Sequence, residues 1–270
     1  MEYVDTSAMQ QIKLPDTQSL SDPRQLAVDR VGVKNLRHPI EIRDKEQSRQ
    51  HTVATIQLTV DLPHHFKGTH MSRFIEVLNE HGRVLHVENI SRILDRLVER
   101  LDSEQAHVEF EFPFFLEKRA PASGALGMMD YVVRFSASAN ASAHDLAVTV
   151  VVPVATLCPC SKAISERGAH NQRGEVKLSV RSLEPIWIED LVQLVEQSAS
   201  CELFSLLKRP DEKAVTERAY DAPVFVEDLV RNVALRANAD SNIVGYCVEA
   251  ENFESIHNHN AYAMIRSNWD

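Results

Sequence analysis

Apolar residues in this chain follow two different spacings, and these spacings alternate along its length. Short extended or alternating stretches, which predict strands with one buried face, lie in the first half at residues 31–42, 53–60, 108–112 and 131–135. Apolar residues three and four positions apart predict two helices, at residues 72–81 and 90–101. The predicted order of the first half is therefore β-β-α-α-β-β.

The second half repeats this order. Strand patterns lie at residues 146–152, 175–180, 243–249 and 261–265, and helical patterns at residues 188–207 and 224–237. A long loop is expected over residues 153–173. The predicted fold class is α+β, with two tandem units that each form an antiparallel sheet with a pair of helices on one face.

These patterns predict three parts of the chain. Residues 1–30 show little periodicity and form an N-terminal arm, residues 31–140 form the first unit, and residues 141–270 form the second. The boundary between the units is expected in the run of small and polar residues at 138–145.

Charge and hydropathy exclude several classes of protein. The formal net charge of the 270 residues is −10, which argues against a general nucleic-acid binder, since such proteins need a basic surface. No apolar run approaches the roughly 20 residues that span a bilayer, and the polar N-terminus does not resemble a secretory signal. We therefore expect a cytoplasmic protein with reduced cysteines.

The segment from Thr156 to Arg173 carries the strongest chemical signal. Cys158, Cys160 and His170 lie in one predicted loop, and thiolate and imidazole groups suit zinc or a similar divalent ion. The alternative is two small buried thiols and a surface histidine. A closed four-cysteine zinc site is not expected, because the chain has no second cysteine pair of this kind.

A second polar cluster lies near the C-terminus. Glu254 and His257 are three residues apart, a spacing that would place both on one face of a helical turn and could complete a mixed metal site. His259 is either a partner or a bystander, and the whole stretch could instead be a solvated loop.

Two more carboxylates have ordinary explanations when considered alone. Glu212 lies in a charged connection between two predicted helices, as a solvated loop residue would. Glu227 lies near the start of the last helix, where the helix dipole favours an acid. Cys201 and Cys247 fall in helix and strand patterns, and both are predicted to be in the core.

The first half offers a possible site for an anion. Lys67, Ser72 and Arg73 are hydrogen-bond donors near the start of the helix predicted at residues 72–81, where free backbone N–H groups favour a phosphate. The alternative is a capped helix start with solvated charges. Neither a P-loop nor a Rossmann glycine motif is present.

Five motifs together resemble the type IB GTP cyclohydrolases, in the order of that family and over nearly the whole chain. They are LPDTQ (14–18), HHFKGTHMSRF (64–74), TLCPCSKAIS (156–165), GAHNQR (168–173) and ENFESIHNHNAY (251–262). The resemblance implies two tandem tunnelling-fold units and a homotetramer with active sites at subunit interfaces, while the charge and hydropathy given above predict no nucleic-acid or membrane partner. It also implies conversion of GTP and water to 7,8-dihydroneopterin triphosphate and formate, the first step towards tetrahydrofolate.

The resemblance also assigns roles to individual residues. One divalent metal ion, zinc or manganese, would be held by residues drawn from Cys158, His170, Glu212, Glu254 and His257. His170 is the candidate for proton transfer, and Cys160 matches a second active-site cysteine. Glu227 would anchor the guanine ring, and Lys67, Ser72 and Arg73 would face the triphosphate.

Two other functions remain as alternatives to the cyclohydrolase. One is a tunnelling-fold nitrile reductase, which would use a cysteine nucleophile and NADPH and would need no metal. The other is a non-catalytic module that binds a purine or a metal ion and leaves GTP intact.

Overall fold

The computed structural model describes residues 16–82, 85–140 and 143–269, so half of the predicted N-terminal arm, residues 1–15, lies outside the described part. The elements, in chain order, are β1 (Val28–Asp44), β2 (Ser48–Leu62), α1 (Met71–Glu80), β3 (Leu85–His86), the 3₁₀ turn η1 (Val87–Asn89), α2 (Ile90–Leu101), β4 (Gln105–Arg119), β5 (Leu126–Asn140), β6 (His144–Leu157), α3 (Pro159–Ile164), β7 (Asn171–Ser182), α4 (Ile188–Glu196), β8 (Cys201–Glu202), α5 (Arg209–Asp221), α6 (Val226–Ala239), β9 (Ile243–Asn252) and β10 (Ala261–Ser267). The chain is therefore α+β, as predicted.

The described strands form one ten-stranded sheet. Its order is β10-β9-β7-β6-β5-β4-β2-β1-β3, and β8 pairs with β6. All neighbours are antiparallel except the short β1–β3 pair. β5 and β6, which flank the predicted boundary, pair directly along residues 132–139 and 144–151. The sheet thus runs without a break from one half of the chain into the other.

One row of side chains shows how the sheet acquires a single apolar face. Residues directly opposite each other on paired strands point to the same side. Following these pairs from β2 to β9 gives the row Ile56, Phe110, Phe135, Val148, Val180 and Tyr246. All six belong to or pack against one hydrophobic core. The alternation of apolar and polar side chains along each strand is therefore in register with that of its neighbours. Both halves of the sheet turn their apolar side in the same direction.

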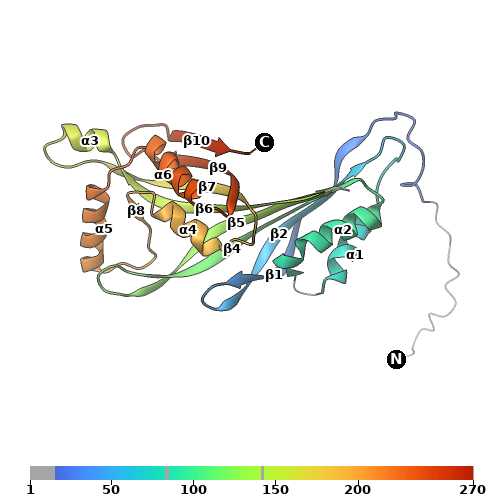
Figure 1. The fold of residues 1–270 in the computed structure, drawn as a ribbon, viewed down its shortest axis with the longest axis horizontal. Helices are drawn as coiled ribbons and strands as arrows, with labels where there is room; N and C mark the ends of the chain where they lie inside the picture. Colours follow the sequence, from blue (N-terminus) through green and yellow to red (C-terminus); the bar gives the residue numbers. More distant parts are fainter. Residues whose placement is uncertain (1–15, 83–84, 141–142, 270) are drawn as a thin grey trace, which may run out of the picture.

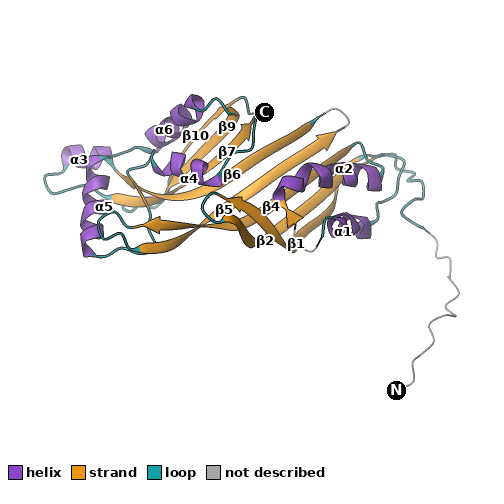
Figure 2. Cartoon of the chain, turned by 60° about the horizontal axis from the view of Figure 1, so that its bottom comes forward, coloured by secondary structure: helices purple, strands orange, loops and turns teal. Residues whose placement is uncertain are grey.

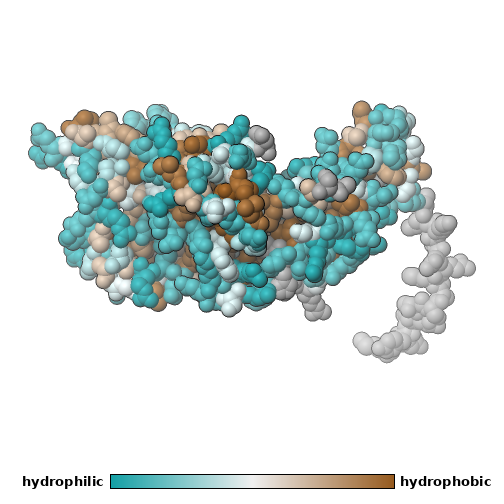
Figure 3. Space-filling view, in the orientation of Figure 1, coloured by the Kyte–Doolittle hydropathy of each residue, from teal (hydrophilic) through white to brown (hydrophobic). Residues whose placement is uncertain are grey.

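Two groups of helices cover that apolar face. α1 and α2 pack on β1, β2, β4 and β5, while α4 and α6 pack on β6, β7, β9 and β10 (Figures 1 and 2). On the same face, apolar residues gather near the middle of the molecule, between the two groups (Figure 3). None of the helices in the described residues has the length and apolar character needed to cross a membrane.

Most predicted elements are present, and the differences have physical reasons. The predicted helix at 188–207 is wrong beyond Glu196, because the polar Gln197 and Ser198 end α4 and the chain then adds β8 to the sheet. Cys201 lies in that strand rather than in a helix, but both Cys201 and Cys247 are buried as predicted. Burial raises the pKa of both thiols, which keeps them protonated core residues.

The sequence patterns missed two helices. The connection predicted around Glu212 is helix α5, which starts with Pro210 in its first turn and is too polar to show an apolar stripe. The buried Asp211 carboxylate accepts hydrogen bonds from the backbone of Ala122 and Ser123, so α5 is tied to the β4–β5 turn. The loop predicted at 153–173 contains the end of β6, the short helix α3 and the start of β7.

Replacing a residue of the apolar row tests the importance of its register. Phe110 is 1% exposed, so Phe110→Ala should lower the free energy of unfolding by about 3–5 kcal/mol, measured by chemical denaturation. Phe115, on the same strand but with the opposite side-chain direction, is 40% exposed. Phe115→Ala should cost much less, and similar losses for the two variants would contradict a one-sided core.

Candidate functional site

Two loops that carry sequence motifs meet at one end of the sheet. The β6–β7 connection spans residues 158–170, and the β9–β10 connection spans residues 253–260. Because β7 runs antiparallel to both β6 and β9, the end of β6, the start of β7 and the end of β9 lie together. The pair Gly174–Asn252 and the hydrogen bond from Phe253 N to Arg173 O (2.9 Å) join the two connections directly.

A cavity of about 290 Å³ lies between these loops and the start of α6. Twelve residues line it: Cys158, His170, Gln172, Val224, Phe225, Val226, Glu227, Asn252, Glu254, His257, His259 and Ala261. Five of the predicted site residues are therefore brought together by the fold, from four separate parts of the chain. Gln172 and Asn252 also line the cavity, and the sequence interpretation did not include them.

The backbone holds Cys158 and His170 next to each other. Cys158 N donates to His170 O (3.1 Å), and Cys158 then forms the N-cap of α3, where its Sγ accepts from Ser161 N (3.4 Å). Ser161 Oγ accepts from His170 N at 3.2 Å. Both site residues are half-buried, so they are fixed by main-chain contacts while their side chains remain accessible from the cavity.

A chain of side-chain hydrogen bonds links the two loops. His170 Nδ1 lies 3.0 Å from Gln172 Oε1, and Gln172 Nε2 donates to Glu254 Oε1 at 3.4 Å. Ser255 Oγ also lies 3.4 Å from His170 Nδ1. Glu254 and His257 lie in a loop of bends rather than in a helical turn, and the His257 ring stacks on that of His259, with centroids 5.2 Å apart.

Asn252 closes one wall of the cavity. The residue is 2% exposed, and its Oδ1 has no hydrogen-bond partner among the residues that the structure describes. Gly174 on the neighbouring strand allows this placement, because a Cβ there would lie 2.6 Å from Asn252 Oδ1. A buried carbonyl oxygen without a donor is costly, so Asn252 Oδ1 is an unsatisfied acceptor in this wall.

Glu227 reaches the cavity from the first turn of α6. The prediction that it lies near the start of the last helix is confirmed. The hydrogen bond from Val224 N to Leu157 O (3.0 Å) holds the segment before α6 against the end of β6. Val224, Phe225 and Val226 add apolar surface beside the Glu227 carboxylate, as a pocket for a flat heteroaromatic ring requires.

The fold does not bring Cys160 or Glu212 into the lining of this cavity. Cys160 is exposed on α3, and Glu212 is exposed on α5. α3 and α5 are adjacent, since Lys162 Nζ donates to Tyr220 O and lies 4.2 Å from the centre of the Tyr220 ring.

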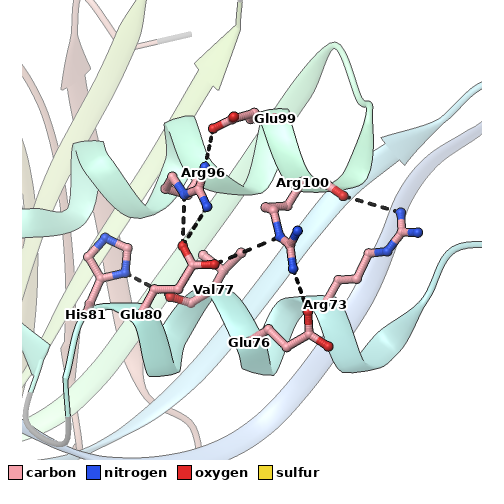
Figure 4. A network of polar contacts seen from close by, with 8 residues as sticks. All are labelled: Arg73, Glu76, Val77, Glu80, His81, Arg96, Glu99 and Arg100. Atoms are coloured by element: carbon pink, nitrogen blue, oxygen red, sulfur yellow. Dashed lines mark hydrogen bonds and ion pairs between the residues drawn. The ribbon is translucent and has the colours of Figure 1, made fainter.

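The three predicted triphosphate donors lie at the opposite end of the sheet. β2 ends beside the start of β4, whereas the cavity lies where β6 ends, and Figure 1 shows α1 and α3 at opposite ends of the molecule. Lys67 and Ser72 are exposed. Arg73 donates to Arg100 O at 3.3 Å, at the edge of the ionic network that joins α1 to α2 (Figure 4).

The two N-terminal motifs are in contact with each other. Gly68 N donates to Gln18 O (3.2 Å), and Lys67 N donates to Leu20 O (3.0 Å). His70 Nε2 lies 3.3 Å from Asp16 Oδ2. Within one chain, the motifs therefore form two groups, one at each end of the sheet.

The donor chemistry of the cavity fits a divalent transition metal, because thiol, imidazole and carboxylate groups are its usual ligands. Among the residues that the structure describes, no three histidine, cysteine, aspartate or glutamate side chains are arranged to hold a metal ion. Glu254, His257 and His259 all belong to the one connecting loop, so the arrangement of this loop decides whether the donors converge.

Comparisons with known proteins agree with the motifs. A family model described as type I GTP cyclohydrolase folE2 matches residues 14–263. The GTP cyclohydrolase FolE2 of Akkermansia muciniphila is 61% identical over 260 residues, which cover 95% of this chain and 98% of that protein. The protein of the same name from Methylobacillus flagellatus is 56% identical over 252 residues, or 93% and 95% of the two chains.

Solved structures show a related fold at low identity. A uricase from Bacillus fastidious matches with a TM-score of 0.54 at 6% identity, covering 89% of this chain and 92% of that one. The urate oxidase from Bacillus subtilis 168 matches with a TM-score of 0.52 at 6% identity, covering 90% and 98%. These likenesses concern the fold alone, but the sequence matches extend over nearly the whole chain. The chain therefore belongs to the type I GTP cyclohydrolase FolE2 family.

Proposed function

We propose that this protein is a GTP cyclohydrolase I of type IB, which converts GTP and water to 7,8-dihydroneopterin triphosphate and formate. The observation that carries this proposal is the single cavity that gathers Cys158, His170, Glu227, Glu254 and His257 in a member of this family. The reaction hydrolyses the imidazole ring of guanine at C8 and releases that carbon as formate. It therefore requires an activated water, a proton carrier and a firm hold on the base.

Cys158, His170, Glu254 and His257 are the residues that we expect to hold one zinc or manganese ion. A divalent ion held there would supply hydroxide at neutral pH, because such an ion lowers the pKa of water from about 15.7 towards 7. Cys158 provides the softest donor, and the backbone contacts of the β6–β7 connection hold it beside His170. Glu212 would join this set only if α5 or the loops were rearranged, or through a second chain.

Glu227 is placed to hold the guanine ring. Its carboxylate can accept hydrogen bonds from the ring N1–H and the exocyclic amino group, and the apolar segment at 224–226 can pack against the base. Such a site favours guanine over purines that lack these donors, because the carboxylate would then lose its hydrogen-bond partners on the base.

We further propose that complete sites form between chains of a homotetramer built from tandem tunnelling-fold units. With α3, α5 and the short strands set aside, the order β1-β2-α1-α2-β4-β5 is followed by β6-β7-α4-α6-β9-β10, which supports the tandem arrangement. The separation of Lys67, Ser72 and Arg73 from the cavity supports a site shared by two chains, since the two groups lie at opposite ends of the sheet, whose strand β4 alone has 15 residues at about 3.3 Å each.

The direct test is turnover of GTP by the purified protein, with formate and oxidised, fluorescent pterin as readouts. A strong chelator should abolish both products, because hydroxide would no longer form at neutral pH without the ion. Adding zinc or manganese back should restore them. Turnover that continues in the presence of the chelator would refute the requirement for a metal ion. Consumption of NADPH without formate would favour the nitrile reductase, and binding of GTP without turnover would favour the binding module.

Replacing Glu227 tests the guanine contact. Glu227→Gln should raise KM for GTP about 10-fold to 100-fold, because a charge-assisted hydrogen-bond pair is lost, with metal content unchanged. The effect should be smaller for inosine triphosphate, which lacks the exocyclic amino group. Asp228→Asn, in the same helical turn but paired with Arg231 (3.2 Å), is the matched control. Loss of metal in Glu227→Gln would place Glu227 at the ion instead.

A mixing experiment tests the shared site. Cys158→Ala and Lys67→Ala chains should each show low activity. The first lacks a metal ligand in the cavity, and the second lacks a contact to the triphosphate. If each site takes these residues from different chains, randomly mixed oligomers should recover about a quarter of the wild-type activity. Activity no higher than that of the two parents would argue that the two residues do not serve one site across an interface.

A further inference from the structure

We propose that Gln172 is a positioning residue that fixes the tautomer of His170 and anchors Glu254, so that His170 presents its Nε2 lone pair to the metal or proton. This inference deepens the proposed function and rests on it for the role of His170. The tautomer itself follows from contacts within this chain.

Gln172 is placed to act on both loops at once. It lies near the start of β7, where its backbone pairs with Thr156 of β6. Gln172 as a whole is 8% exposed. Its side-chain amide lies between His170 Nδ1 (3.0 Å) and Glu254 Oε1 (3.4 Å). Gln172 thus links the β6–β7 connection to the β9–β10 connection from a position within strand β7.

The chemistry of the partners determines which way the amide points. An ionised carboxylate can only accept hydrogen bonds, so Glu254 requires the NH₂ group of Gln172. The amide oxygen must then face His170 Nδ1, and because that oxygen can only accept, Nδ1 must carry a proton. The reverse orientation would place two acceptor oxygens against each other at the Glu254 end. Only one arrangement therefore satisfies all three groups.

In a neutral imidazole, a proton on Nδ1 leaves Nε2 with a free lone pair. That is the form that binds a metal ion or accepts a proton, and a hydrogen-bonded Nδ1 also increases the basicity of Nε2. Ser255 Oγ, 3.4 Å from the same Nδ1, can share this proton but does not compete for Nε2. Without Gln172, His170 could exchange freely between tautomers, and Glu254 would lose its hold on the strand.

The test uses Gln172→Met, which has nearly the same volume and no hydrogen-bonding amide. Gln193→Met, at an exposed position of α4 away from the cavity, is the control for the same substitution. In metal-free protein labelled with ¹⁵N at histidine, at pH 8 where an ordinary imidazole is neutral, the ring nitrogens of His170 report the tautomer directly. Their signals are identified by their loss in His170→Gln.

The wild type and the control should show a protonated Nδ1 and an unprotonated Nε2, and Gln172→Met should show a mixture of the two tautomers. The affinity for zinc, measured by competition with a chelator, should fall about 10-fold to 100-fold in Gln172→Met and remain unchanged in the control. A lowered melting temperature with the tautomer and the zinc affinity unchanged would mean that Gln172 only packs. A wild-type His170 protonated on Nε2 would overturn the proposal outright.

The outcomes separate this proposal from the enzymatic one. A protein that binds zinc through a fixed His170 but releases no formate from GTP would refute the cyclohydrolase and leave the Gln172 bridge intact. Turnover of GTP with wild-type zinc affinity in Gln172→Met would refute the bridge alone.

Discussion

The antiparallel register of the sheet is the constraint on which the rest of the structure depends. A shift of one residue between two strands would turn half of the row from Ile56 to Tyr246 away from the helices. The same register sets where each connection emerges, and so it places the segments after β6 and β9 beside each other. Core and cavity therefore have a common origin: the hydrophobic pattern that selects the register also brings together loops about 90 residues apart in sequence.

A partly buried ion pair connects the central strand β4 to the end of α4. Lys118 Nζ on β4 lies 2.6 Å from Glu196 Oε1 at the end of α4, and Tyr131 of β5 donates to the same oxygen at 2.8 Å. Burial and the Glu196 charge raise the pKa of Tyr131, so its hydroxyl stays a donor. Removing water from the Lys118 and Glu196 charges costs free energy. Their ion pair and the hydrogen bond that Glu196 accepts from Tyr131 offset that cost. α4 in turn packs on α6, which carries Glu227.

The sequence predicted the elements with strong periodicity and the residues with distinctive chemistry. The spacing of Ile93, Leu94 and Leu97 predicted α2 with its actual bounds, whereas α5 has almost no apolar face and therefore showed no helical pattern. Cys158 and Glu227 could be suspected from their types, but their shared cavity depends on pairing between distant strands, which no local pattern contains. Gln172 had one usable signal: in extended chain, it points to the same side as position 170.

The overall negative charge of the chain does not prevent it from holding a triphosphate, because charges are screened beyond about 8 Å at physiological ionic strength and the local groups decide. Two carboxylates lie near the start of α1: Asp16, which contacts His70, and Asp22, whose charge interacts with that of Lys67. Hydrogen bonds from Arg24 lower the pKa of Asp22 and occupy both of its oxygens. Lys67 is exposed, and within the described residues its Nζ makes no direct hydrogen bond or ion pair, although its charge acts on Asp22. An acidic protein can therefore present a local cationic surface, provided that its nearby carboxylates already have partners.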